Sequence, residues 1–301
     1  MPRSLPNRPL LIERLITATR LKSYETVFGT HDDLELVGAY LWNSAVAATF
    51  LPVLSAAEIT LRNAVDAALR PALGEFWWRA TTLHFRSFKI DGPVPGDVKG
   101  LRDNFAAATK LVKRDRKDRY GRADYAPSHH DIIAKTNFST WEYILSSEFA
   151  GDNLIWPKHL GKVFAGPWPF PKARKTLTHA RLLVSNLRCF RNRLSHHEPL
   201  WKTSGVHSAR SAMAHLHEKI DAAEYLLQLI HPASLALLRK NGILPALRRT
   251  CREEELKRYQ HASVEHRIGC LRDLQLAVTE SLSNNRTVDG RVSEAAFRIH
   301  P

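Results

Sequence analysis

Apolar residues recur at steps of three and four along most of this chain, and this spacing restricts the fold more than any other feature. Between about 204 and 230 the spaced residues are Met213, Leu216, Ile220, Ala223, Leu227 and Ile230. Such steps place side chains on one face of an α-helix, whereas a half-buried strand alternates every second residue. No segment sustains that alternation, so the sequence predicts an all-α fold.

The same spacing predicts where the helices lie. A first helix is expected over about 10–28 and ends at Gly29, and a second begins after Asp32 or Asp33 and is interrupted by Pro52. Further helices are expected to reach Pro71 and to cover about 98–112, 137–145, 172–197, 204–230, 233–240, 244–259 and 271–282. We expect one domain over 1–260, with N-terminal helices in 10–120 and a helical hairpin at about 172–230. Residues 261–301 are expected to be a partly disordered extension, loose from 284 onward.

Composition limits the partners and the compartment. Lys and Arg exceed Asp and Glu by 44 to 30, a formal charge of +14, which suits a polyanion such as RNA but equally an acidic substrate or an anionic membrane. The three cysteines are too few for a disulfide framework and too dispersed for a zinc knuckle. Without a signal peptide or a predicted membrane-spanning run, the expected location is the cytoplasm, with no membrane partner.

The segment Cys-Phe-Arg-Asn-Arg-Leu-Ser-His-His-Glu-Pro, residues 189–199, holds the densest group of side chains able to move a proton or bind a phosphate. An apolar stripe ahead of it predicts a helix that Pro199 closes. At about 100° per residue, Arg191, Asn192 and His196 lie on the side of the helix opposite that stripe, whereas His197 lies on the same side as the stripe. Asn192 and His196 are i,i+4 neighbours, so the amide is expected to hydrogen-bond to the imidazole.

This group can carry out acid–base chemistry on a phosphodiester. A His side chain can take a proton from a hydroxyl or give one to a leaving oxygen, and an Arg fork can hold the phosphate, without any metal or other cofactor. Arg191 and His196 lie about 140° apart around a helix and ~7.5 Å along it. They reach one phosphate only if the Arg side chain curls inward or if a second copy of the helix completes the site.

Three blocks of the sequence carry a resemblance to a known family. The first runs from Tyr40-Leu41-Trp42-Asn43 to Glu58-Ile59-Thr60-Leu61-Arg62-Asn63, and the second is Asn137-Phe138-Ser139-Thr140-Trp141 with its continuation to Leu160. The third runs from Leu187-Arg188 to Pro199. In this order the blocks resemble the Abi-like (abortive infection) proteins, a branch of the HEPN superfamily of helical nucleases.

The resemblance implies a HEPN-like helical bundle with additional N- and C-terminal helices. It also implies a homodimer that cuts RNA without metal and leaves a 2′,3′-cyclic phosphate, with Arg191 and His196 as the catalytic pair and Asn192 beside them. His197 fits the family spacing too, and the helical arc favours His196. Arg193, His197 and Glu198 are expected to support the site; Ser195 stands where relatives tend to have Ala.

The charged and polar residues at the end of the first block can be interpreted in two ways. Glu58 and Arg62 are i,i+4 partners with Asn63 alongside, which indicates either a surface ion pair or a carboxylate that orients Arg62 or a residue of the 172–197 helix. We predict that Glu58, Arg62 and Asn63 support the catalytic residues.

Two further segments bear on partners. Positive charge is most concentrated over 110–122, where Lys113, Arg114, Arg116 and Lys117 are candidates for RNA contact or simply a solvated helix end. His129 and His130 invite a metal reading, but adjacent helical residues diverge by about 100° and Ser128 with Asp131 suits a helix cap. We predict no metal site.

Two functions of different classes follow. The first is a toxin-like endoribonuclease of phage defence, with an antitoxin or a phage-derived trigger as a candidate partner. The second is a catalytically inactive HEPN-fold module that binds RNA or regulates another protein, because a fold does not determine an activity.

Overall fold

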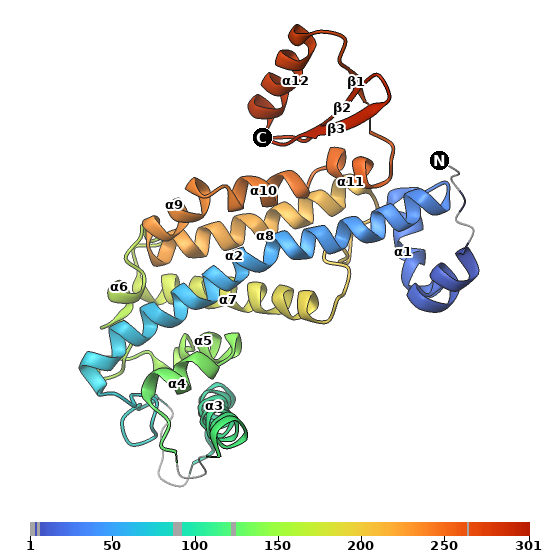
Figure 1. Ribbon diagram of the computed structural model, residues 1–301. Coiled ribbons are helices and arrows are strands. Elements are labelled where there is room, and N and C mark those ends of the chain that lie inside the picture. Colours follow the sequence, from blue (N-terminus) through green and yellow to red (C-terminus); the bar gives the residue numbers. More distant parts are fainter. Residues whose placement is uncertain (1–3, 5–6, 87–91, 122–124, 264) are drawn as a thin grey trace. The chain divides into compact units, whose positions relative to one another are not determined.

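The protein is mainly helical, as predicted. The structure is a computed structural model that describes residue 4 and residues 7–86, 92–121, 125–263 and 265–301 (Figure 1). Helices make up 66% of it and strands 5%, which confirms the helical class.

The chain divides into two compact units that are interleaved in sequence. Unit 1 consists of Met1–Val53, Asn192–Asp221 and Leu238–Pro301, and unit 2 of Leu54–Arg191 and Ala222–Leu237. Three long helices contribute residues to both: α2 (Asp33–Leu73), α7 (Ala173–Ser195) and α8 (Ala209–Ile230). Residues 261–301, expected to be a separate extension, belong to unit 1.

The first predicted helix, over about 10–28, consists of two separate elements. The two helices predicted before and after Pro52 form one continuous helix. A π-helix, η1 (Pro9–Ile16), is followed by α1 (Ala18–Phe28), with Thr17 between them at φ 77°. Gly29 ends α1 in the left-handed conformation, as expected. The prediction that Pro52 interrupts a helix is wrong, because α2 continues through it. Pro52 is exposed while Phe50, Val53 and Leu54 are buried, so packing on one side offsets the lost backbone hydrogen bond.

Helix α2 is also apolar enough to pass a membrane-span test by length and composition. Its most apolar stretch has a mean hydropathy of 1.6 and is 33% buried; α2 is the single such helix in the described part of the chain. Length and composition are weak evidence for a membrane-spanning helix, because the core helix of a water-soluble domain passes the same test. The buried side chains of α2 include Trp42, Val46, Phe50, Ala57, Leu61 and Val65.

Unit 2 contains an aromatic core between short helices. The long α3 (Gly96–Tyr120) packs against α4 (His129–Lys135) and α5 (Phe138–Ile144), as Figure 1 shows. Trp77, Trp78, Phe105 and Trp141 pack against one another there. Ser128 and Asp131 form the predicted capping box of α4, and Asn137 caps α5. The 3-10 helix η2 (Ser147–Phe149) and α6 (Leu160–Val163) lead to α7.

The apolar pattern of α8 is confirmed. The six side chains that predicted its inner face are all buried: Met213, Leu216, Ile220, Ala223, Leu227 and Ile230. Within unit 2 the ring of His179, near the start of α7, lies 5.4 Å from that of Tyr225, near the end of α8. This contact suits the expected antiparallel hairpin.

The C-terminal region holds strands that the sequence did not predict. After α9 (Pro232–Lys240), α10 (Ile243–Thr250) and α11 (Glu253–Tyr259) comes a sheet of order β1-β2-β3 that packs on α12 (Leu271–Asn284). Strand β1 (His266–Arg267) is parallel to β2 (Val288–Val292), and β2 pairs antiparallel with β3 (Ala295–Ile299). The expectation that residues from 284 onward are loose is therefore wrong. A three-stranded sheet with strands this short takes its stability from the helix on which it packs.

Candidate functional site

The predicted cluster lies at the end of α7, which stops at Ser195 rather than at His197. His197 has φ 55° and its N–H donates to the carbonyl of Leu194 (3.1 Å), while the N–H of Glu198 donates to that of Arg193 (3.0 Å). These two bonds form a Schellman motif, which closes a helix with one left-handed residue. The helix thus ends four residues before Pro199. The boundary between the units falls within α7, so Arg191 belongs to unit 2 and Asn192–Asp221 to unit 1.

This turn overturns the argument that separated the two histidines. We expected His197 to point with the apolar stripe of the helix, but it lies beyond the helix in a left-handed conformation and is exposed. His196 is exposed too. The helical arc therefore no longer distinguishes them, and the family spacing does not either, because both histidines satisfy it.

Arg193 holds the loop after the helix. Its guanidinium donates to the carboxylate of Glu198 (3.1 Å), to the carbonyl of Pro199 (2.6 Å) and to the carbonyl of Lys202. The Arg193 side chain is about a quarter exposed. Through these three bonds Arg193, together with Glu198, fixes the backbone of the loop that follows α7.

Two side chains that the sequence did not single out fasten the same loop within unit 1. The amide oxygen of Asn43, in α2, accepts from the N–H of Leu200 (2.9 Å), and Arg20, in α1, donates to the carbonyl of His197. Trp201 is fully buried against the rings of Tyr24 (5.1 Å) and Phe28 (4.7 Å). Asn43 belongs to the first block of resemblance, so its presence there was the one signal for this role.

The expected contact between Asn192 and His196 takes a different form. The N–H of His196 donates to the backbone carbonyl of Asn192 at 3.0 Å. A bond between the Asn192 amide and the imidazole is not among the hydrogen bonds of the described chain. This bond fixes the backbone of His196, whose side chain is exposed.

In unit 2 the structure brings Glu58 to Arg191. The carboxylate of Glu58 lies 4.0 Å from the guanidinium of Arg191; Glu58 is 17% exposed and Arg191 40%. Burial raises the pKa of Glu58, and the charges of Arg191 and Arg62 oppose that rise. Arg62 lies near Asn63, whose amide oxygen accepts from it at 3.4 Å. Of the two readings of Glu58, the geometry fits the one in which it faces the α7 helix.

A second ion pair joins α7 to the second block of resemblance. Arg188 donates to the carboxylate of Glu142, in α5, and both groups are largely buried. This hydrogen bond raises the pKa of Arg188. Within unit 2, α7 is therefore tied both to α2 and to α5 by buried carboxylates.

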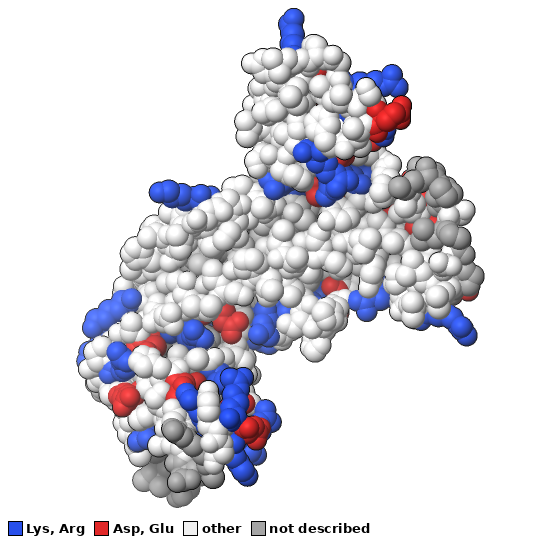
Figure 2. Space-filling view, in the orientation of Figure 1, with Lys and Arg blue, Asp and Glu red and all other residues white. Residues whose placement is uncertain are grey.

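The basic segment at the end of α3 is mostly solvated. Lys113, Arg114 and Lys117 are exposed, whereas Arg116 is paired with Asp131 (3.4 Å) and lies over the rings of Tyr125 (4.8 Å) and Tyr120 (5.5 Å). In Figure 2, Lys and Arg atoms gather with some Asp and Glu atoms over the region of α3. Arg122 lies outside the described residues.

The two adjacent histidines of α4 have different environments. His129 is buried with its Nε2 atom 2.8 Å from the carboxylate of Asp66, which also accepts from the indole of Trp77 (2.8 Å). His130 is exposed. Within the described ranges there is no group of three or more His, Cys, Asp or Glu side chains placed to hold a metal ion.

Comparison with known proteins adds no relative. No protein-family model, no curated protein and no solved structure matches the chain.

Proposed function

We propose that this protein is a metal-independent endoribonuclease of the HEPN type, a toxin-like component of phage defence that acts in the cytoplasm as a homodimer. The observation that carries the proposal is the end of α7, where two exposed imidazoles follow a partly exposed guanidinium in the family order Arg-Asn-Arg-x-x-His-His. The other features of the chain do not determine which reaction the protein catalyses.

The reaction uses groups that this segment contains. The imidazole of His196 takes the proton of a ribose 2′-hydroxyl, whose oxygen attacks the adjacent phosphorus while the bond from phosphorus to the 5′-oxygen breaks. The leaving oxygen takes a proton from water, and His196 then returns its proton to the solvent; the products are a 2′,3′-cyclic phosphate and a 5′-hydroxyl end. Arg191 binds the phosphate oxygens and stabilises the charge that grows on them.

The carboxylate of Glu58 has a positioning role in this scheme. At 4.0 Å from Arg191 it forms an ion pair that limits the directions that the guanidinium can take. Arg62 and Asn63 lie on the same helix, where they would support the phosphate. Asn192 contributes the carbonyl that fixes the backbone of His196.

A homodimer supplies what a single helix lacks. Side chains five positions apart on one helix diverge by about 140°. Arg191 of one copy and His196 of a second copy can approach one phosphate without that restriction. The exposed cations of α3 would follow the RNA backbone outside the site, and an antitoxin or phage-derived trigger would control the activity.

The test is cleavage of end-labelled RNA by purified protein in excess EDTA. We expect cleavage with 2′,3′-cyclic phosphate ends, lost by about 100-fold or more in Arg191→Ala and in His196→Ala, and abolished by a 2′-deoxy substitution at the cut site. His197→Gly is the matched control, because glycine suits the left-handed position and removes the neighbouring imidazole. If His197→Gly loses activity and His196→Ala keeps it, His197 is the base; cleavage that needs a metal contradicts the proposal.

A non-catalytic RNA-binding module is the second candidate. The exposed Lys113, Arg114 and Lys117 favour it, since they need neither Arg191 nor His196 to hold an RNA backbone. Salt-dependent RNA binding that is weakened by changes in α3, with no cleavage of any RNA tested, would select it.

A further inference from the structure

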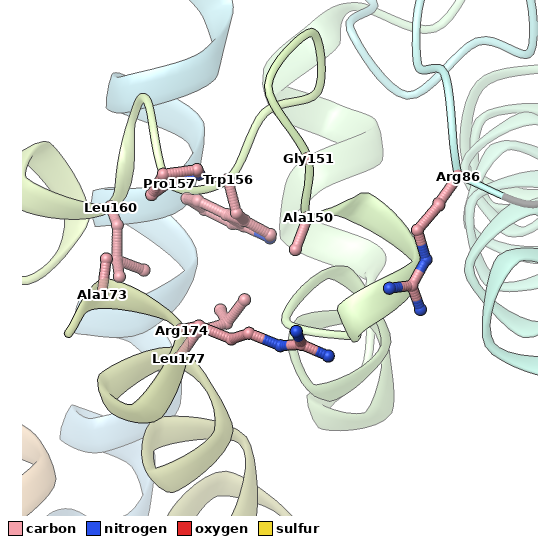
Figure 3. A pocket seen from close by; sticks show the side chains of 9 residues that line it. All are labelled: Arg86, Ala150, Gly151, Trp156, Pro157, Leu160, Ala173, Arg174 and Leu177. Carbon is pink, nitrogen blue, oxygen red and sulfur yellow. The ribbon is translucent and has the colours of Figure 1, made fainter.

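A pocket of about 200 Å³ lies in unit 2, at the start of α7 and away from the residues considered above. Figure 3 shows its walls, which come from three segments. The loop before α6 and α6 itself supply Ala150, Gly151, Trp156, Pro157 and Leu160, the first turns of α7 supply Ala173, Arg174 and Leu177, and Arg86 completes it.

The floor of the pocket is apolar and held in place. Trp156, Leu160 and Leu177 are at most 3% exposed. The indole N–H of Trp156 donates to the carbonyl of Ile144 (2.8 Å), and the backbone N–H of Gly151 donates to the carbonyl of Trp156 (2.8 Å). Because these bonds are satisfied without a ligand, the cavity is already formed, as most small-molecule sites are.

Among the residues that the structure describes, the charged side chains that line the pocket are two arginines, Arg86 and Arg174. Both extend from the walls toward the part of the pocket next to Ala150 (Figure 3). The guanidinium of Arg86 lies 3.9 Å from the carboxylate of Glu148, which is outside the lining and balances part of its charge. Arg174 is exposed and makes no ion pair within the described ranges of the chain. The pocket therefore has an excess of positive charge over an apolar floor.

The geometry points to a binding site for a small organic phosphate monoester with one apolar group. Two guanidinium groups suit the oxygens of a doubly charged phosphate, and the floor suits an aromatic or branched aliphatic group. Typical ligand pockets measure about 300–1,000 Å³, so a cavity of about 200 Å³ takes a single ring and not a whole nucleotide.

This inference is independent of the proposed nuclease. Arg174 and Arg191 are 17 positions apart on α7, about 25 Å along the helix, so a ligand in the pocket does not contact Arg191. Binding can therefore be measured in a protein whose nuclease residues are substituted.

The probe is phenyl phosphate, titrated by calorimetry into the full-length protein. We expect one saturable site, with affinity at least about tenfold higher than for inorganic phosphate, phenol or benzoate, because each of these lacks the ring, the charge or the second negative charge. Absence of saturation at millimolar probe overturns the inference. Equal or tighter binding of benzoate overturns the assignment to a phosphate.

Variants locate the site. Arg174→Ala should weaken binding by about tenfold or more, and Ala173→Leu, which fills the cavity, should abolish it. Lys175→Ala is the matched control: it removes one positive charge from the exposed neighbouring residue that does not line the pocket, and should change affinity by less than about twofold. Equal losses in Arg174→Ala and Lys175→Ala would mean non-specific charge and would refute the site. Unchanged thermal transitions in all three variants exclude unfolding as the cause.

Discussion

Two helices of this protein, α3 and α7, end in the same way in sequence but differ in how their cations are used. Both have basic residues in the last turns, and each is followed by a left-handed residue, Gly121 after α3 and His197 after α7. At the end of α7, Arg193 is bound to three acceptors of the loop. At the end of α3, Lys113, Arg114 and Lys117 are exposed to solvent.

The difference shows that local charge density does not report which cations are available to a ligand. The loop after α7 returns past the helix end, so backbone carbonyls reach the guanidinium of Arg193. At the end of α3, Arg116 has an ion-pair partner because α4 brings Asp131 to it, whereas Lys113, Arg114 and Lys117 are exposed. Availability is therefore decided by the chain that follows each helix.

The largest expected effect distinguishes the packing of the two ends. Trp201→Ala should lower the free energy of unfolding by about 3–5 kcal/mol, because Trp201 is fully buried where it anchors the loop after α7. Tyr120→Ala, at the end of α3, should change it by less than about 0.5 kcal/mol, since Tyr120 is 61% exposed. Urea unfolding measures both. Similar losses in the two variants would show that the α3 end is as firmly packed as the α7 end.

The next effect separates a bound arginine from exposed cations. Arg193→Ala should cost about 2–3 kcal/mol of stability, because it removes charge-assisted hydrogen bonds to Glu198 and to the loop carbonyls. Lys117→Ala should cost less than about 0.5 kcal/mol but weaken RNA binding and lower its salt dependence. The pair is measured by urea unfolding and by RNA titration at two salt concentrations. A stable Arg193→Ala variant with weakened RNA binding would reverse the roles assigned here.

The two regions should also lose stability in different pH ranges. Burial lowers the pKa of His215, near Arg193, so the folded state disfavours its protonated form; stability is present above about pH 6.5 and falls as pH decreases below it. Hydrogen bonds from Tyr125 and Ser128 lower the pKa of Asp131 to about 2, so its contribution is present above about pH 4 and is lost between about pH 4 and 2.

Substitutions test this assignment. The dependence of unfolding on pH should flatten below about pH 6.5 in His215→Gln, and between about pH 4 and 2 in Asp131→Asn. If His215→Gln leaves the neutral-to-acid slope unchanged, His217, whose pKa is also lowered by burial, is the next group to test.

The smallest effect concerns the caps themselves. His197→Gly should stabilise the protein by about 0.5–1 kcal/mol, because glycine adopts φ 55° without strain, while Gly121→Ala at φ 64° should destabilise it by a similar amount. His196→Gly, at a position with a helical hydrogen bond, should destabilise and serves as the control. Thermal unfolding measures all three. A loss of stability in His197→Gly would mean that the imidazole makes a contact worth more than the backbone strain.

Helix positions could be read from the sequence because they depend on local spacing. The buried face of α8, the capping box of Ser128 and the glycine end of α1 each follow from residues a few positions apart. Predictions failed where distant residues decide. Packing beside Phe50 and Val53 carries α2 through Pro52, and α12 supports a β-hairpin that has no alternation strong enough to predict it.

The candidate site divides in the same way. The order of Arg191, Asn192, His196 and His197 at a helix end follows from the amino-acid sequence alone, because a Pro and a polar run stop a helix close to where they occur. The tertiary structure decided that Arg193 serves the loop, that Asn43 and Arg20 hold the turn in which His197 becomes exposed, and that Glu58 faces Arg191. These contacts join residues far apart in sequence, and their strength depends on burial and on the position of backbone carbonyls, which local spacing does not specify.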